Sequence, residues 1–370
     1  MTLEPESIDD VPRLDAICRG EGEHPLLELV RLLENNGEIY HINNLWVRNR
    51  KNKIIHRNPC NRFVEDLESL PFPDRELFPY QSIIDSDFGT ALFMFARGCP
   101  FNCAYCSNQA LKSVQEGKYV RFRSVDSCMN EIEEVLRNYH CKAIYINDDL
   151  FTLNKTFVGE FCREYKKRFD LPFDINTRVG FLTEEICQQL KKANCRRVNI
   201  GIESGNPRIR QKVLNRKMTN EQIINAFKMI KNAGLKTKSF NMIGFPEETP
   251  EDFQDTIDLN KIIQPDSVIL NVFDPYPGTP LGERCKKEGL IDYERMETKL
   301  IPKTDTVLNL PQFSRKEIKR FYKIFAYEVY KKNSLKRAMF YRIYYSSIGE
   351  RLVRILSPVK DILRRWTMGI

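Results

Sequence analysis

The sequence has little histidine and no long hydrophobic run. Its four histidines are too few and too scattered to suggest a histidine-based metal site, since they lie at His24, His41, His56 and His140. No hydrophobic stretch reaches the roughly 18 residues that a membrane-spanning helix requires, and no basic-then-apolar leader follows Met1. We therefore expect a chain that is neither integral to a membrane nor secreted.

The composition excludes a disordered or collagen-like chain. The 370 residues are 42% hydrophobic and 29% charged, which is enough apolar sequence for a large buried core. Eleven cysteines in a chain with no export signal are expected to stay reduced in the cytoplasm, where free thiols act as metal ligands or as catalytic groups. The spacing of the cysteines therefore matters more than their number.

Basic charge is concentrated near the C-terminus. The net charge is +8, but fifteen Lys or Arg stand against four acids from Arg315 to Arg365, so that stretch carries +11 and the rest about −3. No nucleic-acid-binding module is recognisable. We predict no nucleic-acid partner.

Short β-rich runs alternate with helix-like stretches through the middle of the chain, which indicates successive βα units. Several helix candidates begin at Ser, Thr or Asn with an acid in the first turn, as N-caps do. Six such units predict an α/β fold whose parallel sheet curls into a partial (β/α)6 barrel, with a doubly wound open sheet as the alternative. The expected strands are Thr90–Ala96, Ala143–Asn147, Phe173–Thr177, Arg197–Ile202, Lys236–Ile243 and Ser267–Phe273, and the expected helices are Ser124–Asn138, Asn154–Phe169, Thr183–Ala193, Asn220–Asn232 and Thr249–Ile263.

The pattern divides the chain into three parts. Residues 1–87 hold turn-rich pieces, a hairpin candidate at Asn43–Arg57 and a Pro-rich linker at Leu70–Asp74. The βα units occupy residues 88–290, and residues 291–370 form a helical C-terminal extension. The barrel is therefore expected to be the middle domain.

Cys99, Cys103 and Cys106 form a C-x3-C-x2-C triplet directly after the first predicted strand. A cubane iron–sulfur cluster is normally held by four thiolates, so three on one tight loop would leave the fourth iron open for a ligand. Gly98 suits a sharp turn, and the ring of Tyr105 offers a flat face to a cofactor. Structural zinc is one alternative, but no fourth ligand follows at zinc-finger spacing. A chance grouping of core cysteines is the other.

The triplet, its place after the first strand and its aromatic neighbour closely resemble the radical S-adenosylmethionine (SAM) superfamily, over about residues 88–290. The resemblance implies a [4Fe–4S] cluster whose open iron is chelated by the amino and carboxylate groups of SAM. It also implies reductive cleavage of SAM to methionine and a 5′-deoxyadenosyl radical, which abstracts hydrogen from an organic substrate. An electron donor such as ferredoxin or flavodoxin is implied as a partner.

Polar residues follow the other predicted strands, whose carboxyl ends would meet at one mouth of a barrel. The resemblance implies that either Asp148 or Asp149 holds the SAM amino group, where the family commonly carries Gly-Gly-Glu. Later strand ends are implied to contact the SAM carboxylate, ribose and adenine, although each residue has a structural alternative as a helix cap or loop residue. No separate acid–base residue is predicted. The expected SAM-binding residues are Tyr105, Asn147, Asp148, Asp149, Arg178, Glu203, Ser204, Met242 and Gly244.

The N-terminal residues resemble the end of the cobalamin-binding domain that precedes the barrel in one radical SAM subfamily. Asp15–Glu23 is similar to its last strand and Pro25–Glu34 to its last helix. The rest of that domain and its Asp-x-His-x-x-Gly motif are missing, so cobalamin is expected only if the missing domain is supplied. The subfamily implies C-methylation or oxidative cyclisation, and a non-catalytic iron–sulfur redox or scaffold protein is the alternative.

Apolar residues recur in the tail at steps of four and three, which predicts one face of a helix with basic residues off that face. Pro358 should kink or divide it. Such a helix either docks on the barrel or a partner, or binds the anionic inner face of a membrane. The expected substrate is a small molecule or a lipid-like molecule, and membrane binding would suit a lipid-like one. The stripe consists of Tyr341, Tyr345, Ile348, Leu352, Ile355, Val359, Ile362 and Trp366.

Overall fold

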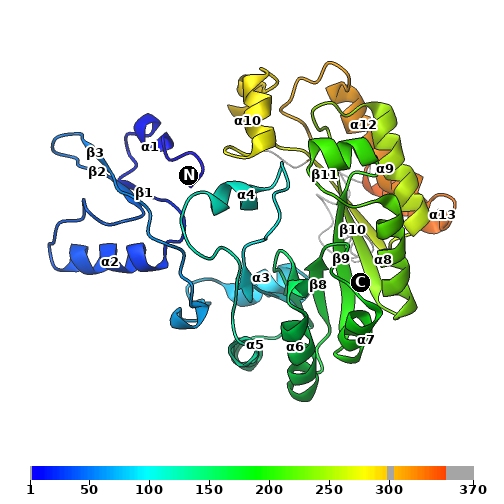
Figure 1. The fold of residues 1–370 in the computed structure, drawn as a ribbon, viewed down its shortest axis with the longest axis horizontal. Coiled ribbons are helices and arrows are strands. Elements are labelled where there is room, and N and C mark those ends of the chain that lie inside the picture. Colours follow the sequence, from blue (N-terminus) through cyan, green and yellow to red (C-terminus); the bar gives the residue numbers. More distant parts are fainter. Residues whose placement is uncertain (1, 298–303, 347–370) are drawn as a thin grey trace. The chain divides into compact units, whose positions relative to one another are not determined.

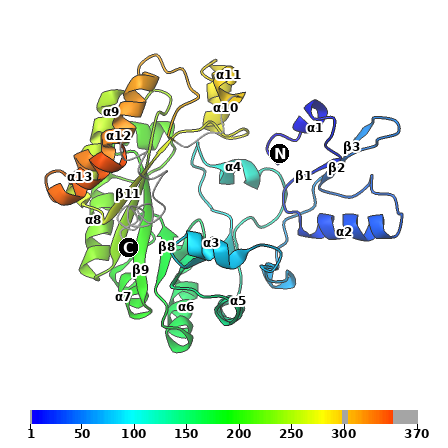
Figure 2. The ribbon, with the colours of Figure 1, turned by 180° about the vertical axis from the view of Figure 1, so that it is seen from behind.

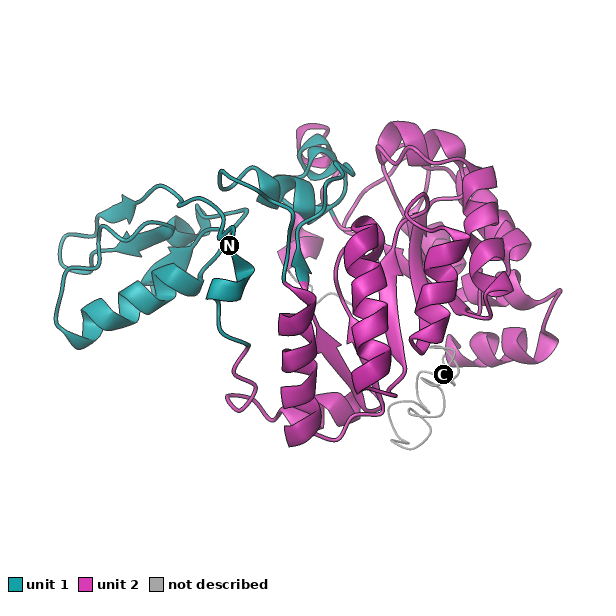
Figure 3. Ribbon diagram, turned by 60° about the horizontal axis from the view of Figure 1, so that its bottom comes forward, with its two compact units in different colours: residues 1–72, 96–123, 275–284 teal, residues 73–95, 124–274, 285–370 magenta. Residues whose placement is uncertain are grey.

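The computed structural model describes residues 2–297 and 304–346. The chain divides into two compact units, which Figure 3 colours separately. Unit 1 comprises Met1–Phe72, Ala96–Arg123 and Pro275–Arg284, and unit 2 comprises Pro73–Phe95, Ser124–Asp274 and Cys285–Ile370. The three domains predicted from the sequence follow chain order and remain a prediction.

Unit 2 is built on a six-stranded parallel sheet that curls into a half-barrel (Figure 1). The spatial order β4-β7-β8-β9-β10-β11 repeats the order along the chain. The sheet therefore winds in one direction, whereas a doubly wound sheet reverses, so the predicted partial barrel is confirmed. The strands are β4 (Thr90–Phe93), β7 (Ala143–Ile146), β8 (Phe173–Thr177), β9 (Cys195–Glu203), β10 (Lys236–Ile243) and β11 (Ser267–Val272).

Five helices follow the strands, and four of them begin where their caps predict; the cap of the fifth is Thr219 rather than Asn220. The side chains of Ser124, Asn154, Thr183 and Thr249 each accept a hydrogen bond from the amide three residues later. The helices are α5 (Val125–Asn138), α6 (Lys155–Arg168), α7 (Glu184–Lys192), α8 (Asn220–Asn232) and α9 (Pro250–Ile263), while α3 (Tyr80–Ser86) precedes β4 and short helical turns lie at Phe151–Leu153 and Ile209–Val213.

Buried polar contacts show which face of β10 the helices cover. The side chain of Asn260 on α9 binds two residues of β10: its Oδ1 accepts from the Ser239 hydroxyl at 2.6 Å, and its Nδ2 donates to Asn241 Oδ1 at 2.8 Å. Successive side chains of a strand point to opposite faces, so Lys238 and Phe240 face the inner side of the half-barrel. Figure 2 shows α8 and α9 on the outer side of the half-barrel.

The predicted first strand is four residues long rather than seven, because its backbone is diverted after Phe93. The amide of Phe95 donates to the carboxylate of Asp148 at 2.7 Å rather than to a ladder partner. Ala96–Arg97 then forms a separate strand, β5, which pairs antiparallel with β6 (Arg121–Phe122) in unit 1. The alternating apolar run alone predicted a continuous strand.

Unit 1 also contains the three-stranded antiparallel sheet β1-β2-β3. The hairpin predicted at Asn43–Arg57 is confirmed as β2 and β3. The elements of this unit are α1 (Ser7–Asp10), β1 (Ala16–Cys18), α2 (Glu23–Glu34), β2 (Leu45–Arg48), β3 (Ile55–Arg57), a helical turn at Leu67–Ser69, and α4 (Ser107–Lys112). The helix α10 (Pro280–Lys287) begins in unit 1 and ends in unit 2.

The C-terminal helices of unit 2 are α11 (Tyr293–Glu297), α12 (Arg315–Tyr330) and α13 (Leu335–Tyr344). α12 packs against α9 and β11. Tyr341 of α13 is buried and its ring stacks on Tyr330 at 5.5 Å, so the start of the predicted stripe docks on α12. The stripe from Ile348 onward lies outside the described residues. Within residues 2–297 and 304–346, no helix has the length and apolarity to cross a bilayer.

Candidate active site

The three cysteines lie on one loop of unit 1, between β5 and α4. Cys103 is 6% exposed, while Cys99, Cys106 and the neighbouring Tyr105 are half-buried. The amide of Cys106 donates to the carbonyl of Cys103 at 3.1 Å, and Cys106 directly precedes α4. The turn thus holds three sulfur atoms within eight residues and screens them partly from water.

Gly98 fixes the entry into this loop. Its φ is +84°, a left-handed conformation that favours glycine. A Cβ atom at this position would lie 2.4 Å from the carbonyl oxygen of Tyr119, which is backbone and cannot rotate away. The sequence predicted a turn residue here, and the structure adds the close approach of a second backbone segment.

Contacts from distant residues hold the loop in place. The carbonyl of Ala104 accepts a hydrogen bond from the amide of Leu281 at 2.9 Å, which attaches the Pro275–Arg284 segment to the loop. The hydroxyl of Tyr119 donates to Asn108 Oδ1 at 2.6 Å. Asn108 Nδ2 in turn lies 3.7 Å from Cys106 Sγ, so the amide is oriented to donate to that sulfur.

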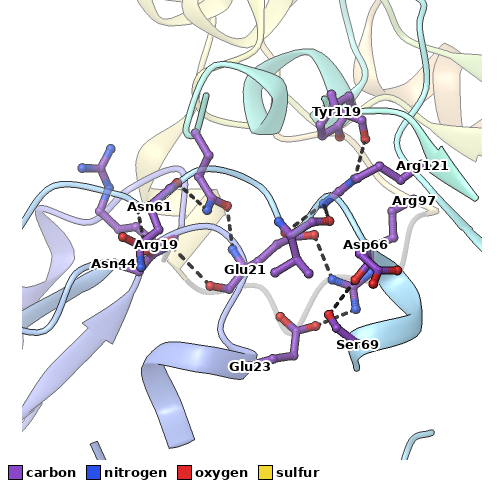
Figure 4. Close-up of polar contacts among 12 residues, drawn as sticks. Arg19, Glu21, Glu23, Asn44, Asn61, Asp66, Ser69, Arg97, Tyr119 and Arg121 are labelled. Carbon is purple, nitrogen blue, oxygen red and sulfur yellow. Dashed lines mark hydrogen bonds and ion pairs between the residues drawn. The ribbon is translucent and has the colours of Figure 1, made fainter. Parts of the chain in front are cut away.

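A partly buried ion-pair network joins the N-terminal segment to the strands on either side of the loop (Figure 4). The carboxylate of Glu21 binds Arg97 at 2.8 Å and Arg121 at 2.9 Å, and Arg97 also binds Glu23 at 2.5 Å. Burial alone would raise the pKa of Glu21, but the hydrogen bonds from Arg121 and Arg97 outweigh it and lower that pKa. The N-terminal segment thereby anchors both strands that carry the cysteine loop.

The chemistry of three thiolates within one loop suits an iron–sulfur cluster. Over residues 2–297 and 304–346, no three His, Cys, Asp or Glu side chains gather around a point that could hold one ion. A cubane does not require this, because each thiolate binds a different iron. Cys99, Cys103 and Cys106 are therefore the residues that would hold a [4Fe–4S] cluster.

The end of β7 separates two neighbouring aspartates. Asp148 is 1% exposed, and its Oδ1 accepts the amide of Phe95 at 2.7 Å. Asn147 and Asp149, on either side, are exposed. A ligand from solvent therefore reaches Asp149, whereas Asp148 ties the end of β7 to the segment after β4.

β9 ends in a strained turn. Glu203 has a φ of +65°, a left-handed conformation that non-glycine residues rarely adopt. Ser204 is fully buried, where its hydroxyl accepts the amide of Asn206 at 3.2 Å and its carbonyl accepts Arg210 at 2.7 Å. Arg178, which follows β8, is 9% exposed. The turn holds Ser204 inside, and Glu203 is only 9% exposed, with its carboxylate over Gly201.

A glycine follows β10, and a buried glutamate accepts a hydrogen bond from its amide. The sequence analysis assigned this glutamate no role. Gly244 has a φ of +87° and donates to Glu248 Oε2 at 2.6 Å, and Phe245 donates to the same oxygen at 3.2 Å. Glu248 is fully buried, and its Oε1 has no hydrogen-bond partner in the described part of the chain. Met242, two residues before Gly244, is half-buried.

The structure groups the predicted site residues in two sets. Unit 1 holds the cysteines and Tyr105, and unit 2 holds the strand-end residues from Asn147 to Gly244. Within unit 2, these residues follow adjacent parallel strands and so lie along one edge of the half-barrel. Their role in SAM binding remains a prediction.

We predict that Glu248→Gln changes how stability depends on pH. Burial raises the pKa of Glu248 to about 8, although the Gly244 and Phe245 amides lower it in part. The folded chain therefore keeps a proton that the unfolded chain loses near pH 4.5, and the associated stability is lost as pH rises from about 4.5 to 8. Between pH 5 and pH 8, the free energy of unfolding measured with urea should fall by roughly 2–4 kcal/mol more in wild type than in the variant.

Glu247→Gln is the control, because Glu247 is the exposed neighbour of Glu248. That variant should keep the pH dependence of the wild type. If the wild type and Glu248→Gln lost stability equally between pH 5 and 8, Glu248 would be ionised in the folded chain and our assignment would be wrong.

Comparison with known proteins decides the family. Residues 93–259 match the Radical SAM superfamily. An uncharacterized methyltransferase of Pyrococcus horikoshii is 31% identical over 322 residues, which cover 86% of this chain and 68% of that protein. The chain belongs to the radical SAM superfamily. Membership implies a [4Fe–4S] cluster and SAM as cofactors.

More distant relatives add two kinds of similarity. The anaerobic magnesium-protoporphyrin IX monomethyl ester cyclase of Rubrivivax gelatinosus is 26% identical over 79% of this chain and 53% of its own length. The cobalamin-dependent SAM radical enzyme OxsB, solved with aqua-cobalamin and SAM bound, shares the fold with a TM-score of 0.64 at 17% identity. That match covers 99% of this chain and 57% of OxsB. The chain thus spans little more than half the length of these two relatives.

Proposed function

We propose that this chain abstracts a hydrogen atom from an organic substrate with a 5′-deoxyadenosyl radical made at the Cys99, Cys103 and Cys106 loop. The observation that carries the proposal is that loop, with three partly buried cysteines held by Gly98 and by Leu281. When bound, a [4Fe–4S] cluster supplies the electron that cleaves SAM to methionine and the radical. The chain's own part is to hold the cluster, to orient SAM and the substrate, and to shield the reaction from water.

Each set of residues has a distinct task in this proposal. The three thiolates hold three irons and leave the fourth for SAM, while the amide of Asn108 donates toward Cys106. Asp149 accepts from the ammonium group of SAM, and Glu203 accepts from its ribose hydroxyls. A ferredoxin-like or flavodoxin-like protein delivers the electron.

C-methylation is the reaction that we favour, with oxidative cyclisation as the second candidate. The support for methylation is the Pyrococcus methyltransferase, which is 31% identical across 86% of this chain. The support for cyclisation is the Rubrivivax cyclase at 26% identity.

Cobalamin would have to come from a further domain, because OxsB binds it in a chain of which this one matches 57%. Unit 1 offers a surface for such a domain. α2 leaves four large apolar side chains exposed, which are Leu26, Leu27, Val30 and Leu33. Exposed apolar groups of this size are usually covered by another domain or partner.

An open iron can be tested by spectroscopy of the anaerobically reconstituted and reduced chain. SAM that binds the cluster through its amino and carboxylate groups should change the electron paramagnetic resonance spectrum, and the change should saturate at one SAM per chain. A spectrum that does not respond to saturating SAM would exclude an open iron.

Asp149→Ala should weaken SAM binding in this titration, because it removes the acceptor for the ammonium group. Losing a charge-assisted hydrogen bond costs about 1.5–3 kcal/mol, roughly tenfold to a hundredfold in affinity. Asp148→Ala is the paired variant, since Asp148 is buried against the amide of Phe95 and should lower stability instead. Equal SAM affinity in wild type and Asp149→Ala would remove Asp149 from the site.

We also propose that the C-terminal region binds anionic membranes. α13 exposes Leu335, Met339 and Ile343 at four-residue spacing, and the flanking residues Lys332, Lys336 and Arg342 are exposed and basic. Pelleting with anionic vesicles should exceed pelleting with neutral vesicles, and Met339→Glu/Ile343→Glu should abolish it.

The control for membrane binding is Ile262→Glu, which places a glutamate on an exposed apolar residue of α9. It should pellet like wild type. If anionic vesicles carried down wild type and the α13 double variant equally, this face would not be the attachment site.

A further inference from the structure

Three buried polar side chains lie next to one another on the inner face of the half-barrel. In the parallel register, Lys238 of β10 pairs with Asn199 of β9 and with Ser267 of β11. Their exposed fractions are 7%, 2% and 0%. Side chains in register on adjacent parallel strands point to the same face, and Lys238 lies on the face opposite α9. The three residues thus form one continuous row, the inner polar row.

Two members of the inner polar row have a buried polar atom that nothing in the described part of the chain satisfies. Asn199 Oδ1 and Ser267 Oγ are buried and have no hydrogen-bond partner there. No hydrogen bond or ion pair joins Lys238 Nζ to another described residue. Asn176 accepts from Asn199 Nδ2 at 3.1 Å, so that nitrogen is used and the oxygen remains. Burying polar atoms without hydrogen bonds costs free energy, which indicates that a group outside the described residues hydrogen-bonds to them.

The charges around the row favour an anion. Asp174 forms ion pairs with Arg196 at 2.8 Å and with Arg197. The charges of these three residues and of Asp87 also act on Lys238. Three cations therefore stand against two carboxylates. Burial lowers the pKa of Lys238 to about 7, and nearby Arg197 adds to the fall while Asp174 opposes it. An anionic ligand would restore the charge of the amine.

The next level toward the strand ends holds both apolar and charged side chains. Phe240 pairs in register with Ile269, and both are half-buried. Gly201, the partner of Phe240 on β9, has no side chain. A Cβ atom there would lie 2.3 Å from Glu203 Oε1 and 3.2 Å from Arg216 Nη2, so these two charged groups lie over the glycine. Asn199 precedes Glu203 by four residues on β9, a separation of about 13 Å along a strand. A molecule reaching from the strand ends to the inner polar row would pass along Phe240 and Ile269, beside the carboxylate of Glu203.

We propose that the inner polar row binds the carboxylate end of an elongated amphipathic substrate whose apolar body lies along Phe240 and Ile269. Lys238 and Ser267 donate to the carboxylate, and Asn199 Oδ1 accepts an O–H or N–H next to it. The inference rests on the proposed function, which places the reacting carbon near the strand ends. It adds a substrate class, organic acids with an apolar chain.

Calorimetric titration of the full chain with octanoate tests this binding. Octanoate should bind with uptake of protons at pH 7.5, seen as a dependence of the heat on the buffer, because the bound carboxylate favours charged Lys238. Neutral 1-octanol should bind at least tenfold more weakly. Lys238→Met should weaken octanoate binding at least tenfold, and Lys236→Met, at an exposed lysine two residues earlier on the same strand, should not.

Thermal unfolding without ligand provides a second readout. Lys238→Met should raise the unfolding midpoint, because methionine buries no unsatisfied amine. A lower midpoint would assign Lys238 a structural role and overturn the proposal. So would failure of wild type to bind octanoate, or equal binding by wild type and Lys238→Met. The titration needs neither cluster nor SAM. Octanoate binding can therefore fail while SAM cleavage is observed, and SAM cleavage can fail while octanoate binds.

Discussion

Cys103→Ala is expected to lose the cluster and all SAM cleavage. Cys103 is the most buried of the three cysteines and is fixed by the hydrogen bond from the amide of Cys106 to its carbonyl. Three thiolates are the smallest set that holds three irons and leaves one open. Iron and sulfide analysis after anaerobic reconstitution should fall to background, and 5′-deoxyadenosine should not form.

Cys187→Ala is the control for this substitution. Cys187 is fully buried on α7, where burial raises the pKa of its thiol to about 11, so it does not offer a thiolate. This variant should keep both its iron and its SAM cleavage. An intact four-iron cluster in Cys103→Ala would show that the ligand assignment is wrong.

Gly98→Ala is expected to prevent the cysteine loop from closing. The added methyl group would lie 2.4 Å from the carbonyl oxygen of Tyr119, in a residue whose φ of +84° already disfavours a side chain. The carbonyl cannot move independently, because Tyr119 lies two residues before Arg121, which is paired with Glu21. Reconstituted protein should therefore carry much less iron than wild type.

Gly180→Ala separates the two causes. Gly180 has a φ of +95° but no atom within 4 Å of the added Cβ, so it incurs backbone strain without a clash. Strain of this kind costs about 1–3 kcal/mol, and forced overpacking adds about 1–3 kcal/mol. Gly180→Ala should retain its iron. Similar iron contents in Gly98→Ala and Gly180→Ala would show that the loop tolerates the clash.

The elements of the half-barrel could be predicted because their signals are local. Ser124, Asn154, Thr183 and Thr249 cap the helices that they were expected to begin. The spacing of Cys99, Cys103 and Cys106 likewise lies within one loop, so the family could be identified from the sequence. A cap or a triplet needs no information about distant residues.

Features that depend on distant residues were not predicted. The break after Phe93 arises because Asp148, more than fifty positions later, takes the amide of Phe95. The loop's attachment to Leu281 and the pairing of Glu21 with Arg97 and Arg121 span still longer separations. No local pattern distinguishes these partners from other polar residues.

The inner polar row had a signal that sequence reasoning did not use. In β9, polar Asn199 lies between buried, apolar Val198 and Ile200. The neighbours of Lys238 in β10, Thr237 and Ser239, are themselves polar, so β10 lacks this signal. A polar side chain at every second position of an otherwise apolar strand marks one face. Aligning that face between strands requires the register, which only the structure supplies.

Formation of 5′-deoxyadenosine tests the central claim most directly. The reconstituted chain, reduced with dithionite and incubated anaerobically with SAM, should release 5′-deoxyadenosine and methionine in equal amounts, measured by liquid chromatography with mass detection. Cys103→Ala, treated identically, should release neither above a protein-free control. A wild-type chain with a reduced four-iron cluster that yields no 5′-deoxyadenosine would contradict the account and favour a non-catalytic iron–sulfur protein.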